Sequence, residues 1–256
     1  MPLIHGKNRE EAEVVDFLDA HFKKINKEKN NRFKVSMSLI PQNKYILDYG
    51  CGWGHYAVEM AKKNNKVEAI DFPNEIEICT LYWKNQPNIN FSTKKIQDFA
   101  DETFDIVVSS QVIEHVHNPG TYLSEINRVL KTEGSLVISL PNIINPRYVI
   151  PHFNPKYEKR LKEISGIMLN NYDKGNHHIN SWDPRHFVTL LASVGFKLER
   201  YLPTEGIPFP MKKPFTYYKN GYVRNWMSRL GLLKNFSYTM HFVFKKTKKI
   251  TINSND

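Results

Sequence analysis

Residues 45–55 read YILDYGCGWGH, an apolar run that leads into a turn containing Gly50, Gly52 and Gly54. Glycines at this spacing let the backbone turn sharply and approach a ligand closely, because no Cβ stands in the way. A dinucleotide-binding loop would read GxGxxG, but His55 occupies the place of its third glycine. Asp48, just before the turn, would repel a pyrophosphate and attract a cation. The turn is therefore predicted to bind a ligand that carries positive charge.

Residues 66–72, KVEAIDF, predict a second buried strand that ends at an acid. Asp71 lies roughly twenty residues past the glycines, where a nucleotide-binding βαβ unit places the carboxylate that binds ribose hydroxyls, and the adjacent Phe72 is a further candidate for cofactor contact. The alternative is that Asp71 only caps the helix that follows Phe72 and Pro73. Together with Asp48 and the three glycines, the pattern favours S-adenosylmethionine (SAM), whose sulfonium and ammonium groups are cationic.

The chain is similar to class I SAM-dependent methyltransferases, the broad group that includes ubiquinone, menaquinone and many sugar methyltransferases. The resemblance covers most of residues 40–200. It rests on ILDYGCGWG at 46–54, VEAID at 67–71, FDIVVSSQVIEHVHNP at 104–119, EINRVLKTEGSLVISLPN at 125–142 and, more weakly, HINSWDPRHFVTLLASVGF at 178–196. These motifs are specific for SAM, which is the cofactor that the resemblance implies, and they are not specific for the acceptor.

Helical and strand patterns alternate along the chain, which predicts an α/β fold with a doubly wound, mostly parallel sheet of seven strands. Strands are predicted at 44–48, 67–71, 89–92, 105–109, 135–140, 196–201 and 239–244. Helices are predicted at 9–25, 55–64, 74–85, 120–131, 157–168 and from 183. The expected organisation is a SAM-binding core with its N-terminal helix (1–142), a substrate cap (143–182), a core continuation (183–202), a second insertion or lid (203–235), a final strand (236–246) and a basic tail (247–256).

Further cofactor contacts follow from the resemblance. In the family, the turn after the third strand contacts adenine, which implies packing by Ile96 and a polar contact from Gln97 or Asp98. Asp98 is equally well explained as an ordinary turn residue. Gln111, after the fourth strand, is expected to border the methionine part of SAM, although many relatives carry an acid at this position.

Two histidines are the candidates for proton transfer from an acceptor hydroxyl, because an imidazole titrates near neutral pH. His115 belongs to a Glu-His pair after the fourth strand, and the alternative is that it only shapes the site. His178 precedes the helix that starts at Asp183, and the alternative is that it bonds the backbone there. His177, His178 and Asp183 lack the spacing of a metal site, so no metal is predicted.

The composition of the 256 residues points to a soluble chain with a formal charge of +10. No apolar run could span a bilayer and the first residues do not resemble a signal peptide, so we expect a cytoplasmic protein without membrane insertion. The two cysteines form neither a disulfide framework nor a zinc site. Basic residues gather at 156–160 and 212–224, within the expected cap and lid, which makes an anionic acceptor plausible. Those at 245–249 are better explained as a solvated terminus.

Nucleic acid is an unlikely partner despite the charge. Enzymes that methylate the amino group of a base show a Pro-Pro-aromatic turn after the fourth strand, and residues 109–112 read SSQV. The predicted function is O-methylation of a small anionic acceptor, such as a sugar, a nucleotide-linked sugar or a phosphorylated precursor of a cell-surface polysaccharide or capsule. The alternatives are a quinone or phenol acceptor, or a SAM-binding protein that is non-catalytic or associates with RNA. The sequence does not indicate the oligomeric state.

Overall fold

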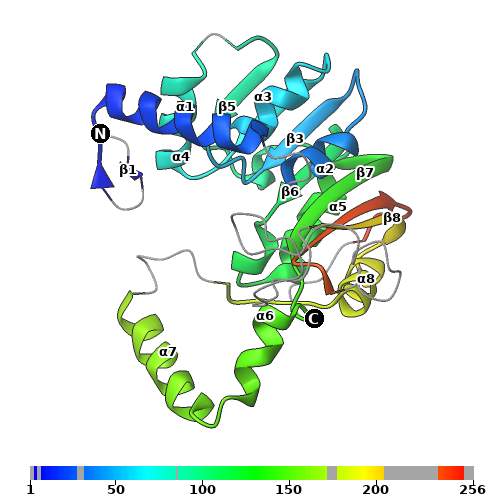
Figure 1. Ribbon diagram of the computed structural model, residues 1–256. Helices are drawn as coiled ribbons and strands as arrows, with labels where there is room; N and C mark the ends of the chain where they lie inside the picture. The colour runs from blue at the N-terminus through cyan, green and yellow to red at the C-terminus, as the bar shows by residue number, and fades with distance from the viewer. Residues whose placement is uncertain are drawn as a thin grey trace.

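The structure, a computed structural model, describes residues 3–4, 7–27, 32–84, 86–171, 178–204 and 236–250. Its centre is a seven-stranded sheet in the order β5-β4-β3-β6-β7-β9-β8, shown in Figure 1. The strands are β3 (Tyr45–Tyr49), β4 (Lys66–Ile70), β5 (Ile89–Ser92), β6 (Phe104–Ser110), β7 (Leu130–Pro141), β8 (Phe196–Thr204) and β9 (Thr239–Lys246). Strands β3 to β7 are parallel, and β9 lies antiparallel between β7 and β8. The predicted α/β fold is confirmed.

Helices cover both faces of this sheet. One face carries α5 (Pro119–Val129) and α8 (Pro184–Ser193), and the other carries α2 (Arg32–Ser38), α3 (His55–Ala61) and α4 (Pro73–Tyr82). Successive residues of a strand point to opposite faces. Leu47 accordingly packs with α5 and α8, while Ile46 packs with α2, α3 and α4. The sheet is therefore buried on both sides, as parallel sheets usually are.

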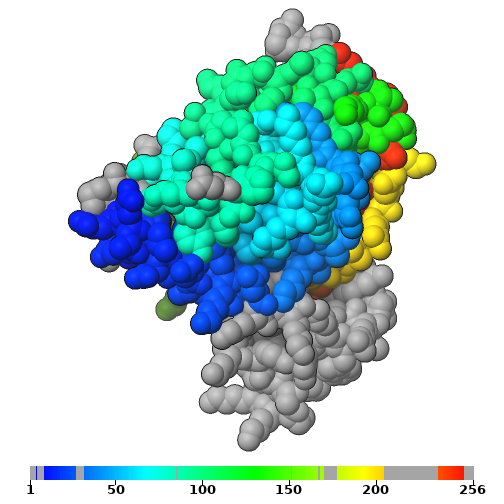
Figure 2. Space-filling view, turned by 90° about the horizontal axis from the view of Figure 1, so that it is seen from above, coloured from blue at the N-terminus to red at the C-terminus, as the bar shows by residue number. Residues whose placement is uncertain are grey.

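The N-terminal segment adds a further layer on one edge of the molecule. A two-residue hairpin, β1 (Leu3–Ile4) and β2 (Lys7–Asn8), precedes α1 (Glu11–Lys27). The apolar side of α1, including Val14 and Leu18, packs on Ile78 of α4. Figure 2 shows the blue surface of this helix against the blue-green surface of the residues that follow the glycine turn.

The expected substrate cap starts after β7 and forms an arm that extends away from the sheet in Figure 1. It contains α6 (Pro146–Val149), a 3₁₀ turn η3 (Ile150–Phe153) and α7 (Tyr157–Asn171). The side chains of Asn142 and Asn145 hold its base by donating to the carbonyls of Ser237 and Phe236. The arm is thus anchored beside the start of β9.

Several elements begin or end at other residues than predicted. Strand β7 begins at Leu130 rather than 135, because Phe104 pairs with Leu130 and Ile106 pairs with Ser135, so that the residues between form an irregularity in the ladder. Strand β8 extends to Thr204, two residues into the expected second insertion, because Thr204 pairs with Thr239. The rest of that insertion, 205–235, lies outside the described residues. Residues 247–250 of the expected tail are described, and Thr247 donates to the carbonyl of Gly195.

The structure also contains short elements that the sequence did not predict. These are α2, α6, the hairpin of β1 and β2, and the 3₁₀ turns η1 (Ile96–Asp98), η2 (Ile113–His115) and η3. Within the described ranges, no helix is long and apolar enough to cross a bilayer.

Candidate cofactor and acceptor site

The glycine turn joins β3 to α3 at the carboxyl end of the sheet. The backbone N–H groups of Gly50 and Cys51 both donate to the Ile70 carbonyl, at 2.9 and 3.2 Å, which ties the turn to β4. Gly50, Gly52 and Gly54 all have positive φ, at 82°, 52° and 77°. A Cβ at Gly50 would lie 2.5 Å from Val112 Cγ2, whereas a Cβ at Gly52 would have no described atom within 4 Å. The turn therefore leaves open space directly above Gly52.

That space belongs to a cavity of about 510 Å³ at the carboxyl end of the strands. The glycine turn forms one wall, α1 and α2 form another, and the end of β6 a third. The base of the arm and Tyr238 complete the lining. The strand order of the sheet reverses between β3 and β6, and the cavity lies at the carboxyl end of these strands. This is where open α/β folds bind ligands, and the size of the cavity suits one.

Asp48 lines the cavity and is 1% exposed. Its Oδ2 has no hydrogen-bond partner among the described residues. Burial, with a smaller effect from the nearby Asp71 carboxylate, raises the pKa of Asp48 to about 8. A buried carboxylate is costly unless something pairs with it. The side chain is thus suited to a cationic ligand, as the sequence predicts.

Asp71 directly follows β4 and is hydrogen-bonded to the glycine turn. Its two carboxylate oxygens accept from the N–H groups of Gly52 and Phe72, each at 2.7 Å. Burial raises the pKa of Asp71, while these two bonds oppose the shift. The residue that caps α4 is Phe72, which uses no side-chain bond, so the alternative that Asp71 serves as the helix cap is wrong. Phe72 is 77% exposed and is not among the residues that line the cavity, so its contact with the cofactor stays a prediction.

Gln111 follows β6 and faces the same cavity. Its φ is +59°, a conformation that non-glycine residues adopt rarely and often at functional sites. Its Oε1 accepts from Arg32 Nη1 at 3.3 Å. Its Nε2 is buried and, in the described part of the chain, has no acceptor. The amide is therefore half satisfied, with a donor left for a ligand.

The predicted adenine contacts lie elsewhere. Ile96 is 2% exposed and packs in the core that faces α5, and Gln97 is exposed on η1. Neither lines the cavity. Asp98 accepts from the N–H of Lys95 at 2.8 Å and so caps its own turn, in line with the alternative explanation. A contact between adenine and Ile96 or Gln97 stays a prediction.

His55 occupies a position whose role the sequence did not indicate. Its ring stacks between Phe22 of α1 and Phe33 of α2, with centroid distances of 4.5 and 4.2 Å. Burial lowers the pKa of His55 to about 4, so the ring is neutral at physiological pH. This stack joins both N-terminal helices to the first turn of α3, beside the glycines. The sequence gives no signal for this stack, because α2, which supplies Phe33, is not predicted and the contact joins distant segments.

The rim of the cavity is cationic. Lys24, Arg32 and Arg147 all line it, whereas Asp48 is its only acidic lining residue within the described chain. The Arg147 guanidinium lies 5.4 Å from the centre of the Tyr238 ring. The single carboxylate of SAM would pair with one of these cations, which leaves the others for a second anionic group.

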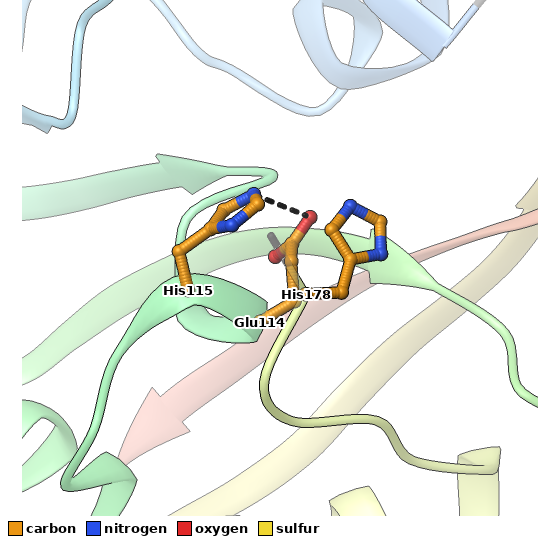
Figure 3. Close-up of side chains that lie close together, drawn as sticks. All are labelled: Glu114, His115 and His178. Atoms are coloured by element: carbon orange, nitrogen blue, oxygen red, sulfur yellow. Dashed lines mark ion pairs between the residues drawn. The ribbon is translucent and has the colours of Figure 1, made fainter. Parts of the chain in front are cut away.

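His115 and His178 come together although they are far apart in the sequence. Their ring centroids lie 4.9 Å apart, and Figure 3 shows the Glu114 carboxylate between the two imidazoles. Glu114 is 1% exposed, and burial raises its pKa to about 7. Burial and the neighbouring His115 lower the pKa of His178. In the sequence, Glu114 stands out only as half of a Glu-His pair, because burial of its side chain has no sequence signature.

Asp183, by contrast, serves as the predicted N-cap of α8. Its Oδ1 accepts from the N–H groups of Arg185 and His186, at 2.9 and 3.2 Å. Its other oxygen bonds the His186 ring. His177 lies outside the described residues.

Comparison with known proteins fits this geometry. A family model described as a methyltransferase domain matches residues 18–201. The chain belongs to this methyltransferase family. A ubiquinone biosynthesis O-methyltransferase of Xanthomonas axonopodis pv. citri is 27% identical over 171 residues, which are 64% of this chain and 67% of that protein.

Solved structures share the fold. A putative methyltransferase from Bacillus halodurans has a TM-score of 0.56 and 19% identity, covering 85% of this chain and 99% of that one. A Burkholderia thailandensis 1,6-didemethyltoxoflavin-N1-methyltransferase, solved with S-adenosylhomocysteine, has a TM-score of 0.52 and 14% identity, covering 96% and 94%. The class I methyltransferase fold is thus confirmed, and SAM is the cofactor of this enzyme.

The residues of the cavity fit that cofactor. Asp48 offers an unpaired carboxylate, Gln111 offers an unpaired amide donor, and the open face of Gly52 leaves space that a Cβ would fill. Arg32 stands beside Gln111 as a partner for a carboxylate. These four groups suit the positive and negative ends of the methionine part of SAM.

Proposed function

We propose that the enzyme transfers the methyl group of SAM to a hydroxyl oxygen of an aromatic, phenol-type acceptor that also carries an anionic group. Two observations support the two parts of this proposal. The curated relative from Xanthomonas is a ubiquinone biosynthesis O-methyltransferase, which favours a phenol or quinol ring. The cationic rim of the cavity, with Arg147 stacked near Tyr238, favours negative charge on that ring.

This proposal replaces the first expectation from sequence, a sugar or a polysaccharide precursor. That expectation rested on net charge and on the basic cap, and neither distinguishes a sugar phosphate from an aromatic carboxylate. The relative named above favours the quinone or phenol alternative instead.

In this proposal the protein aligns the two substrates and keeps water out. SAM, when bound, supplies an activated methyl group with a good leaving group. Asp48, Arg32 and Gln111 would orient the methionine part, and Arg147, at the base of the arm, would hold the anionic group of the acceptor. Neither His115 nor His178 is among the residues that line the cavity, and both stay predicted groups for the proton that the hydroxyl loses.

The test is methyl transfer to a matched pair of acceptors, 3,4-dihydroxybenzoate and catechol, measured as methylated product by mass spectrometry. We expect a kcat/KM at least tenfold higher for the benzoate. Arg147→Gln should remove that preference mainly through KM, whereas Arg160→Gln, on the exposed arm, should retain it. Transfer to sugar phosphates and to neither aromatic compound would contradict the proposal.

A further inference from the structure

The cluster of Glu114, His115 and His178 contains an unusual carboxylate. Glu114 is 1% exposed, and neither of its side-chain oxygens has a hydrogen-bond partner among the described residues. The nearest cationic candidate is His115, whose Nε2 lies 4.0 Å from Glu114 Oε1, too far for a hydrogen bond. Figure 3 marks this contact as an ion pair, but it gives Glu114 no hydrogen bond. A buried carboxylate that accepts no hydrogen bond is costly, so the fold retains an acceptor that a closer cation could satisfy.

Ligand atoms of the three residues converge on one point. One side-chain nitrogen of each histidine and one oxygen of Glu114 all lie within 4.8 Å of one another. Figure 3 shows the carboxylate between the two rings. Small rotations of the side chains would bring these atoms to the distances found around a bound metal, where each bond is ~2.0–2.2 Å.

The backbone fixes the two segments that supply these ligands. The Glu114 carbonyl accepts from the N–H groups of Ile179 and Asn180, at 2.9 and 3.0 Å. The Asn180 side chain donates to the Val116 carbonyl. These bonds hold the segment with His178 against η2, which carries Glu114 and His115. A metal centre requires that its ligand side chains are kept in position in this way.

We propose that Glu114, His115 and His178 bind a divalent transition-metal ion. Two imidazoles and one carboxylate are typical ligands of Zn²⁺ and of neighbouring first-row ions, whereas Mg²⁺ and Ca²⁺ prefer sets made only of oxygen. Three protein ligands leave further positions open for water or for an oxygen of a bound molecule.

The site gives the histidines a shared role. A metal ion there would lower the pKa of a hydroxyl bound to it, and the two histidines would then act as ligands instead of accepting the proton themselves. This consequence for the acceptor rests on the proposed O-methylation, whereas metal binding itself does not. The two can therefore fail independently.

The sequence alone did not predict this site. His178 lies in a different part of the chain from the Glu-His pair, and the spacing of His177, His178 and Asp183 did not match a metal motif. Only the contact between η2 and the segment before α8 completes the set.

The test uses the 256-residue chain, stripped with a chelator and titrated with Zn²⁺ by calorimetry. Bound metal is counted by mass spectrometry after gel filtration. Titration with Co²⁺ adds a visible absorption spectrum that reports coordination. The variants are Glu114→Gln and His178→Asn, and the matched control is His117→Asn, an exposed histidine two residues from His115. SAM binding and circular dichroism confirm that each variant is folded.

We expect one equivalent of Zn²⁺ in the wild type and in H117N, with affinity at least tenfold weaker in E114Q and H178N. Because His178 is exposed, H178N should fold even if E114Q does not. Zn²⁺ binding that is absent from the folded wild type, or equal in the wild type and H178N, would overturn the proposal. Neither outcome depends on turnover, so the proposed O-methylation is judged separately by its own assay.

Discussion

The buried carboxylate of Asp48, which suits it to bind a cation, should lower the stability of the chain when no cofactor is bound. Its pKa in the folded chain is about 8, above the usual value of 3.8, so the folded state holds a proton that the unfolded state releases. The free energy of unfolding should therefore decrease as the pH rises from about 4 to about 8. Asp48→Asn removes this penalty. We expect the variant without cofactor to be ~1–3 kcal/mol more stable than the wild type at pH 8, with no difference below pH 4.

Urea unfolding across this pH range, compared between the two proteins, measures the effect directly. The comparison matters because His55 and His241, whose pKa values burial lowers to about 4, change stability in the opposite direction. They do so equally in both proteins. A variant less stable than the wild type at pH 8 would contradict this account of Asp48.

Gly50 and Gly52 should respond differently to alanine. Both have positive φ, which costs a side chain ~1–2 kcal/mol. At Gly50 the new Cβ also meets Val112 at 2.5 Å, an overpacking that adds ~1–3 kcal/mol. We expect Gly50→Ala to lose ~2–5 kcal/mol of stability and Gly52→Ala ~1–2 kcal/mol. Gly52→Ala should nevertheless weaken SAM binding at least tenfold, because its methyl enters the cavity.

Denaturation curves and SAM titrations of both variants distinguish the two effects. Gly52→Ala protein that binds SAM with wild-type affinity would show that the open space above Gly52 is not the cofactor site.

Among the elements, helix α2 contacts the site through two neighbouring residues. Phe33 is 7% exposed and stacks on His55, while Arg32 contacts Gln111. We expect Phe33→Ala to lower the free energy of unfolding by ~3–5 kcal/mol, as large deletions in a core do, and to speed SAM dissociation. Phe33→Leu, which keeps most of the volume, should retain most of the stability. Unfolding curves and stopped-flow displacement of SAM measure the two quantities, and equal dissociation rates in all three proteins would exclude a role for α2 in cofactor retention.

The sequence predicted the long elements because their patterns are strong. Strands β3, β4 and β6 are apolar and end at turns, and the pair Asp183-Pro184 marks the start of α8. Helix α2 was missed because it has only seven residues, with weak intrinsic helix formers such as Val35, Ser36 and Ser38. Its stability comes from packing of Phe33 and Met37 against the sheet, which no local pattern reveals.

The same limit applies to the site. Asp48 and the glycines belong to one continuous motif, so their place beside a cavity could be predicted. Asp71 was assigned to ribose, and the structure shows its carboxylate bonded to the N–H groups of Gly52 and Phe72. The stack on His55 and the meeting of Glu114 with His178 depend on contacts between distant segments. Only the folded chain shows them.

In the whole molecule, the glycine turn, α1, α2 and the base of the arm all line one cavity. The roles assigned to Asp48, Gln111 and Gly52 require that SAM binds in this cavity. The most direct measurement is a calorimetric titration with SAM of the wild type, Asp48→Asn and the surface control Asp101→Asn, at pH 6 and pH 9. We predict one site in the wild type, which binds SAM more tightly than Asp48→Asn by a factor that rises with pH as Asp48 loses its proton. This factor should be at least tenfold at pH 9, and Asp101→Asn should match the wild type at both pH values. Equal SAM binding by all three proteins at both pH values would contradict the assignment.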